Sequence, residues 1–284
     1  MADIESLVAD LQAEQESLDA VLAQVDEAAW QTDTPAEGWK VQDQVAHLTY
    51  FDGAVTQAIT DPDAFTATLT ERAADPNYVN VVAEPLVALP SSELWAKWKA
   101  GRQPMYDAML GADPKGRYPW YGPPMSVASA CTARIMETWA HGQDVADGLG
   151  IEREPSDRIA HVVFIGYKAR PFAYANRGME VPEGEVRFEL TLPSGKPLVL
   201  GARPANNPQA AGLGSMGAVP AAVGDVNVIR GTALDMALLV TQRRHRADTS
   251  LEAEGPLAEE FLDVAQAFAG PPGGGRKPGQ FPRS

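Results

Sequence analysis

The sequence holds one cysteine and four histidines, and these low counts limit the metal sites it can form. With Cys131 alone, the chain can form no internal disulfide and no zinc site built from several thiolates. A chain without disulfides is typical of the reducing cytoplasm, which is where we expect this protein. Any metal site must therefore combine histidines with carboxylates.

Two further absences narrow the class of protein. No apolar run approaches the roughly 20 residues that a membrane-spanning helix needs, so we expect no membrane partner. Positive charge is also scarce, since 23 Lys and Arg stand against 38 Asp and Glu, a net charge of −15. An acidic surface does not attract nucleic acid, which we expect to be absent as a partner. The acidic, amphipathic start MADIESLVADLQAEQ predicts neither a signal peptide nor a transit peptide.

Helical periodicity dominates the first 178 residues. Apolar residues recur every three or four positions over 4–25 and 41–59, which predicts two amphipathic helices. A third helix is expected after the capping residues Ser91 and Ser92, and a fourth after Ser126, ending at the glycines near position 150. A fifth is expected over 156–176, whereas 60–90 is punctuated by proline and gives only a weak helical signal.

The pattern changes after residue 178. The segment EVRFELTL alternates apolar and polar residues, then come a Pro-Ser-Gly turn and the apolar run PLVL, which together predict a β-hairpin. VNVI predicts a third strand, and GTALDMALLVTQRR and PLAEEFLDVAQAFAG predict helices. We therefore expect an α+β protein: a helical bundle over 1–178, a small α/β domain over 179–270, and a flexible tail over 271–284.

A row of polar side chains follows the expected fourth helix. Arg134, Glu137, His141 and Asp144 are spaced three, four and three residues apart, so they project to one side of it, beside a mostly apolar stripe. Glu137 and His141 are one turn apart and can reach the same ion. Zn²⁺ accepts such a mixture of nitrogen and oxygen ligands. On this spacing alone, an ordinary surface Glu–His pair is the competing interpretation.

A third ligand candidate lies on the expected second helix. His47 is next to the apolar Leu48 and four residues after Asp43, whose carboxylate we expect to accept the other N–H of the His47 ring. Three ligands, His47, Glu137 and His141, would leave a metal open to water or substrate, as in catalytic sites. Asp144 is then expected to support the ligands rather than to bind the ion.

The segments GWKVQDQVAHLTYFD and METWAHGQDVADGLG resemble the DinB-like superfamily, and within it the mycothiol-dependent maleylpyruvate isomerase family. The resemblance implies a DinB-like four-helix bundle whose divalent metal, usually zinc, is bound at the positions of His47, Glu137 and His141. It also implies a small C-terminal domain similar to sterol-carrier proteins, and mycothiol as a thiol cosubstrate. Two departures concern activity: Gly142, Gln143 and Asp144 replace a hydrophobic or Trp-containing run, and Gln242 and Arg243 replace a Gly-Arg pair.

These observations predict a metal-dependent isomerase or thiol transferase acting on a small anionic substrate or thiol. Arg134 and Arg243 are candidates for holding the anion; alternatively, Arg134 pairs with Glu137 or Asp144, and Arg243 is simply solvated at a helix end. Trp120 and Tyr121 either line a pocket mouth or cover the end of the bundle. Two other functions stay open: a non-catalytic metal-binding or sensing protein, and a carrier of an amphipathic ligand.

Overall fold

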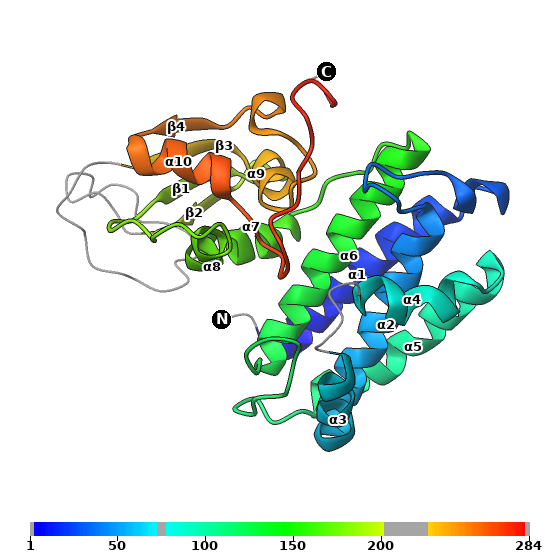
Figure 1. The fold of residues 1–284 in the computed structure, drawn as a ribbon. Coiled ribbons are helices and arrows are strands. Elements are labelled where there is room, and N and C mark those ends of the chain that lie inside the picture. Colours follow the sequence, from blue (N-terminus) through cyan, green and yellow to red (C-terminus); the bar gives the residue numbers. More distant parts are fainter. Residues whose placement is uncertain (1–2, 73–77, 202–226, 282–284) are drawn as a thin grey trace. The chain divides into compact units, whose positions relative to one another are not determined.

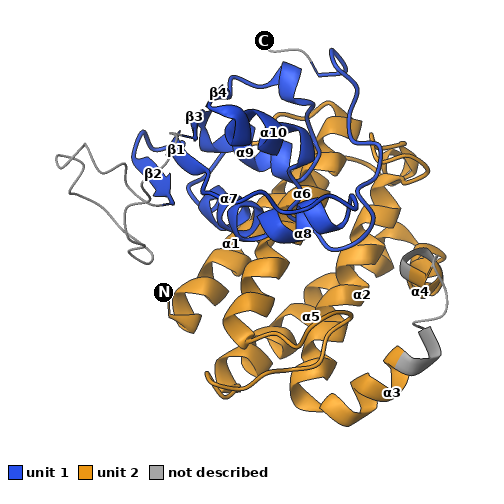
Figure 2. Ribbon diagram, turned by 60° about the vertical axis from the view of Figure 1, so that its left-hand side comes forward, with its two compact units in different colours: residues 1, 154–284 blue, residues 2–153 orange. Residues whose placement is uncertain are grey.

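The computed structural model describes residues 3–72, 78–201 and 227–281. The chain divides into two compact units, residues 2–153 and residues 154–284 (Figure 2). The first unit is helical and the second combines helices with a small sheet, so the protein is α+β as expected. The two units divide between Arg153 and Glu154, whereas the sequence placed the boundary after residue 178. Helix α7 (Ile159–Lys168) belongs to the second unit because it packs on helix α9 (Ala233–Val240).

Four long helices form the framework of the first unit (Figure 1). They are α1 (Ile4–Leu22), α2 (Val41–Thr60), α5 (Ser91–Gly111) and α6 (Val127–Leu149). Helix α2 packs against α5 and α6, and α1 packs against the same two helices, which gives a four-helix bundle. The weakly helical segment after α2 forms two short helices, α3 (Pro62–Arg72) and α4 (Tyr78–Val87), both of which contact α2.

The helix ends follow the capping residues in the sequence. The Ser126 side chain accepts a hydrogen bond from Ser129 N at the start of α6, and Gly150 ends the helix in the left-handed conformation that glycine adopts without strain. Helix α5 begins at Ser91 with Pro90 in the capping position, so Ser91 and Ser92 are not its caps. The apolar stripes of the four helices meet in separate buried clusters, one of which contains Leu11 and Ile135 and another Leu48.

The second unit is built on a four-stranded sheet of order β2-β1-β3-β4. Its strands are β1 (Arg187–Thr191), β2 (Pro197–Leu200), β3 (Val228–Thr232) and β4 (Glu252–Glu254). The predicted hairpin of β1 and β2 is antiparallel, and β3 pairs in parallel with β1. The predicted helix over 156–176 is two helices, α7 and α8 (Arg170–Ala175), while α9 and α10 (Pro256–Val264) match expected helices.

The described part of the tail, residues 271–281, contains no helix or strand. It lies against its own unit, because the Gly279 amide donates to the Asp248 carboxylate and the Arg244 guanidinium lies 4.0 Å from the centre of the Phe281 ring. Residues 282–284 of the expected tail are outside the described part. No helix in the described ranges is long and apolar enough to cross a membrane.

Candidate metal centre

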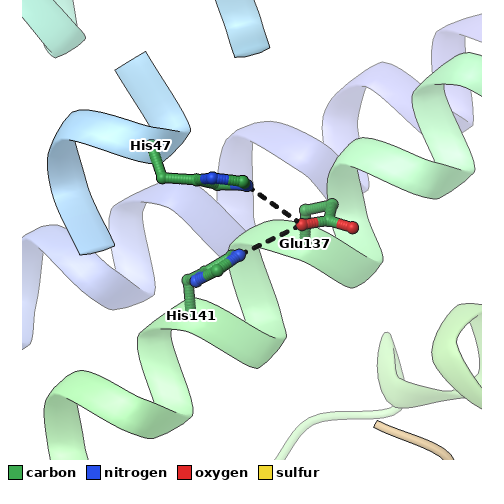
Figure 3. A group of neighbouring side chains, drawn as sticks. All are labelled: His47, Glu137 and His141. Atoms are coloured by element: carbon green, nitrogen blue, oxygen red, sulfur yellow. Dashed lines mark hydrogen bonds and ion pairs between the residues drawn. The ribbon is translucent and has the colours of Figure 1, made fainter. Parts of the chain in front are cut away.

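Helices α2 and α6 bring three side chains to one point of the bundle (Figure 3). The i, i+4 spacing on α6 sets Glu137 and His141 side by side, with His141 Nε2 3.1 Å from Glu137 Oε2. His47 reaches the same oxygen from α2, with its Nε2 3.4 Å away. One ligand atom from each residue lies within 4.8 Å of the other two. The structure thus brings together the three residues that the sequence nominated as ligands.

The spacing and chemistry of these atoms suit a divalent ion. A tetrahedral ion with bonds of about 2.0–2.2 Å holds its ligand atoms roughly 3.3–3.6 Å apart, close to the separations between each imidazole and the carboxylate. Two imidazoles and one carboxylate are a donor set that Zn²⁺ accepts, and three protein ligands leave a position for another molecule. The set fits the metal implied by the resemblance.

Electrostatics hold two of the three groups in the form that a metal ligand needs. Burial and the neighbouring His141 lower the pKa of His47 to about 3, so its imidazole is neutral at physiological pH. Burial alone would raise the pKa of Glu137, but the His141 and His47 imidazoles beside it outweigh burial, and the pKa of this carboxyl lies well below its usual value. Glu137 is therefore ionised.

His141 has a second partner that the sequence analysis did not single out. Its Nδ1 lies 2.5 Å from Oε1 of Gln44, a buried residue on α2. The Gln44 amide nitrogen donates to Thr34 Oγ1 at 2.9 Å, and the Thr34 hydroxyl donates to the Trp39 carbonyl at 2.7 Å. His47 differs, because its buried Nδ1 has no hydrogen-bond partner in the described part of the chain.

Asp43 does not support His47 as the sequence analysis expected. Its carboxylate accepts a hydrogen bond from the backbone N–H of Lys40 at 2.8 Å, three residues earlier. This contact closes the first turn of α2, where four N–H groups lack helical partners. The carboxylate is therefore used to start the helix.

Aromatic rings surround the two histidines. The Trp39 indole stacks on His141, with ring centres 5.8 Å apart and an angle of 17° between the planes, and its centre lies 5.4 Å from that of His47. The Phe51 ring centre lies 4.5 Å from that of His47, and Phe51 also contacts Trp120 and Tyr121. The two loop aromatics therefore belong to a cluster that reaches the candidate site through Phe51.

A buried polar network lies in the core of the same bundle and was missed in the sequence. At its centre is Asp52 of α2, whose carboxylate accepts from Gln15 of α1 at 3.1 Å, Trp98 of α5 at 2.9 Å and Arg134 of α6 at 2.8 Å. Tyr106 of α5 donates to Gln15 in turn. All five side chains are buried. Four helices thus meet at one carboxylate.

This network corrects the assignment of Arg134. The sequence offered a substrate anion, Glu137 or Asp144 as its partner, whereas the structure pairs it with Asp52. The Arg134 side chain is 3% exposed, so its charge is used to neutralise Asp52 inside the core. The described contacts of Arg134 therefore lie inside the core, and its binding of a substrate anion stays a prediction.

Asp144 and Arg243 are the other two residues that the sequence nominated. Asp144 is buried on α6, three residues after His141. Arg243 follows α9 in the second unit, where its guanidinium donates to the Thr241 carbonyl at 2.7 Å. The role of Arg243 in binding an anion, and that of Asp144 in supporting the ligands, stay predictions.

Gly142, which departs from the hydrophobic or Trp-containing run expected at this point of the family, has a structural reason. Arg153 crosses α6 at this point: its guanidinium donates to the Trp139 carbonyl at 2.9 Å and to the buried Glu14 of α1 at 2.7 Å. A Cβ atom added at Gly142 would lie 3.3 Å from Arg153 Nη1, tighter than an ordinary contact. Glycine therefore leaves room for the arginine that ties α6 to α1.

Comparison with known proteins identifies the bundle. Residues 11–146 match the family model described as the mycothiol maleylpyruvate isomerase N-terminal domain, and this range includes all three candidate ligands. Two uncharacterized proteins from two strains of Mycobacterium tuberculosis are 37% identical to the chain over 277 residues, which is 97% of this chain and 100% of each relative. The chain belongs to the mycothiol-dependent maleylpyruvate isomerase family.

Solved structures of the family extend the match to both units. The mycothiol-dependent maleylpyruvate isomerase, and a mutant of it with a histidine replaced by alanine, each align with a TM-score of 0.57 over 90% of this chain and 95% of theirs. Sequence identity in these alignments is 15%. At that level the likeness shows a shared fold, which agrees with the α+β architecture expected from the sequence.

Proposed function

We propose that this chain binds a divalent metal ion, zinc by analogy with the family, through His47, Glu137 and His141. We further propose that it acts as a mycothiol-dependent isomerase or thiol transferase on a small anionic substrate. The observation that carries the proposal is the convergence of two imidazole nitrogens on one ionised carboxylate oxygen, at separations that suit one ion. Membership of a family whose solved member is mycothiol-dependent supports the choice of thiol.

The protein side chains have separate tasks in this proposal. His47, Glu137 and His141 would hold a divalent ion, which would supply a Lewis acid for a bound thiol or water. Glu137 contributes negative charge, and the neutral His47 contributes a lone pair because burial opposes its protonation. Trp39 and Phe51 cover the imidazole rings, which keeps bulk water from the histidine side of the cluster.

The exposure of the three side chains favours one side for a ligand. The Glu137 side chain is 23% exposed, whereas those of His47 and His141 are 10% and 12% exposed. A small thiol or carboxylate would therefore approach beside Glu137.

The first test is the metal content of the purified protein. We expect about one zinc or similar ion per chain, and loss of most of it in His141→Ala, because each lost ligand removes one of only three protein bonds. His161→Ala, which changes a histidine of α7 in the other unit, is the matched control and should keep the metal. Stoichiometric metal in His141→Ala would rule out this ligand set.

The second test separates an enzyme from the two other functions. Mycothiol is titrated by calorimetry into metal-loaded, metal-free and His141→Ala protein. Binding that needs the metal supports thiol chemistry, and turnover of maleylpyruvate would support the isomerase. Metal without thiol binding would favour a metal-binding or sensing protein. Binding of an amphipathic ligand that is indifferent to metal would favour a carrier.

A further inference from the structure

We infer that Gln44 is a positioning residue that fixes the tautomer of His141, through a directed hydrogen-bond chain ending at the Trp39 carbonyl. We call the chain from His141 through Gln44 and Thr34 to Trp39 the tautomer chain. Its importance for metal binding rests on the proposed function, whereas the tautomer is a property of the protein alone.

The direction of every bond in the tautomer chain follows from its last member. A backbone carbonyl can only accept, so the Thr34 hydroxyl must donate to the Trp39 oxygen. That hydroxyl is then left to accept at its oxygen, which matches the donor nitrogen of Gln44 at 2.9 Å. The amide oxygen of Gln44 consequently faces His141 Nδ1, and an amide oxygen can only accept. His141 Nδ1 must therefore carry a proton.

A proton on Nδ1 decides what His141 presents to the cluster. In a neutral imidazole the other nitrogen is then a lone pair, and here that nitrogen is Nε2, 3.1 Å from the Glu137 carboxylate. Two lone pairs at this distance repel unless a cation lies between them. The tautomer chain thus prepares His141 Nε2 to bind a metal ion. His47 has no such support, because its Nδ1 has no hydrogen-bond partner among the described residues.

The tautomer chain is held in place by the loop before α2. Gly38 has a left-handed φ of 76°, a turn that returns Trp39 to Thr34, whose N–H also donates to the Trp39 carbonyl at 2.8 Å. Gly148 of α6 lets the loop approach: a Cβ there would lie 3.0 Å from the Asp33 carbonyl oxygen and 3.2 Å from Thr34 Cα. Both Gln44 and Thr34 are buried, so water does not readily replace either partner.

A purely structural role for Gln44 is the competing explanation, since any buried amide needs partners. Three variants separate the two roles. Gln44→Leu removes both bonds, while Gln44→Glu keeps an acceptor for Nδ1–H. Gln42→Leu is the control, because Gln42 is also buried on α2 but donates to the Val87 and Leu89 carbonyls, away from His141.

The decisive measurement is the ¹⁵N spectrum of the imidazoles in metal-free protein at pH about 8.5, above the ordinary titration range of histidine. The chain has only four histidines, and His141→Ala identifies the signal of interest. We expect the proton on Nδ1 in the wild type, Gln44→Glu and Gln42→Leu. In Gln44→Leu we expect it on Nε2, where Glu137 is the remaining acceptor. A proton on Nε2 in the wild type, or on Nδ1 in Gln44→Leu, would overturn the inference.

Zinc affinity is measured on the same proteins. Loss of such a supporting bond typically weakens metal binding about 10- to 100-fold, which we expect for Gln44→Leu, with recovery to within several-fold in Gln44→Glu. A tautomer switch with equal affinity in all variants would overturn the link to metal binding. If no protein binds zinc but the switch occurs, the proposed function fails while the tautomer assignment stands.

Discussion

Charged side chains are placed differently in the two units of the chain. The bundle buries two ion pairs, Asp52–Arg134 and Glu14–Arg153, whose side chains are at most 7% exposed. In the second unit, Arg230 joins Glu189 and Glu254 at the surface, with Arg230 47% and Glu254 58% exposed. These buried pairs of the bundle contain charges whose desolvation must be compensated by fixed partners, whereas the Arg230 pairs of the sheet contain charges that water can also solvate.

This difference indicates where substitutions should matter most. Removing one partner of a buried pair leaves the other charge without solvent or counter-charge, while a surface charge that loses its partner is rehydrated. The bundle should thus be sensitive to single charge changes and the sheet tolerant of them. Four predictions test this contrast.

The largest effect should follow Asp52→Ala. The change strands the Arg134 charge and leaves the donors of Trp98 and Gln15 without an acceptor. We expect a loss of about 3–5 kcal/mol in the free energy of unfolding, measured by urea denaturation. Asp52→Asn, which keeps the shape but not the charge, should also destabilise strongly. A loss below about 1 kcal/mol in both would contradict the contrast between the units.

Gly142→Ala should have an intermediate effect on the free energy of unfolding, and this effect should depend on Arg153. Gly142→Ala improves helix propensity by about 1 kcal/mol but crowds Arg153, which is held by Glu14 and the Trp139 carbonyl. We expect little or negative gain from Gly142→Ala in the wild type and a gain of about 1 kcal/mol in an Arg153→Ala background. A double-mutant cycle measures this coupling, and strict additivity would show that the two residues do not interact.

A small effect is expected from Arg230→Ala on the sheet. Its ion pairs are exposed, so we expect a loss of about 0.2–1 kcal/mol in the free energy of unfolding. The loss should shrink at high salt, which screens exposed charges, whereas that of Asp52→Ala should persist. Urea denaturation at low and high salt checks both statements; an Arg230→Ala effect as large as that of Asp52→Ala would remove the contrast.

No effect is expected when the native protein is treated with a thiol reagent near pH 8. Burial, aided by Asp10, raises the pKa of the Cys131 thiol to about 12, so the folded protein holds it neutral and covered. Because the folded pKa lies above the ordinary value of 9.0, this thiol contributes stability below pH 9 that is lost as the pH rises towards 12.

Cys131 also reports opening of the bundle. Labelling should become faster in Asp52→Ala and stay slow in Arg230→Ala, as followed by mass spectrometry. Rapid labelling of the wild type would show that the bundle opens locally without any change to its buried charges.

The sequence predicted which three candidate ligands lie together better than it predicted their surroundings. Helical spacing nominated Glu137 and His141, and the motif around His47 supplied the third member, because a local period is enough to place side chains on one face of a helix. Gln44 and Asp52 were missed, since their partners come from other helices and no local pattern marks them. Asp43 was expected to support His47, but its carboxylate accepts a hydrogen bond from the backbone N–H of Lys40, as is common for a carboxylate in the first turn of a helix.

The fold shows the same limit. The long amphipathic helices and the alternating hairpin were predicted, because their periods extend over many residues. The short strand Glu252–Glu254 was missed, since three residues at a sheet edge carry no measurable alternation. The split between α7 and α8 also escaped prediction, as did the unit boundary after Arg153, which depends on packing between segments distant in sequence.

The position of helix α6 in the chain has a consequence for the order in which the bundle can fold. Helix α6 is the last of the four bundle helices to leave the ribosome, and it carries Glu137, His141 and the arginine that neutralises Asp52. Gln44 and His141 are 97 positions apart, so their hydrogen bond can form only after most of the first unit has been synthesised. Until α6 is present, the Asp52 carboxylate lacks the Arg134 charge that neutralises it. Packing α6 onto the other helices therefore also brings the candidate ligands together.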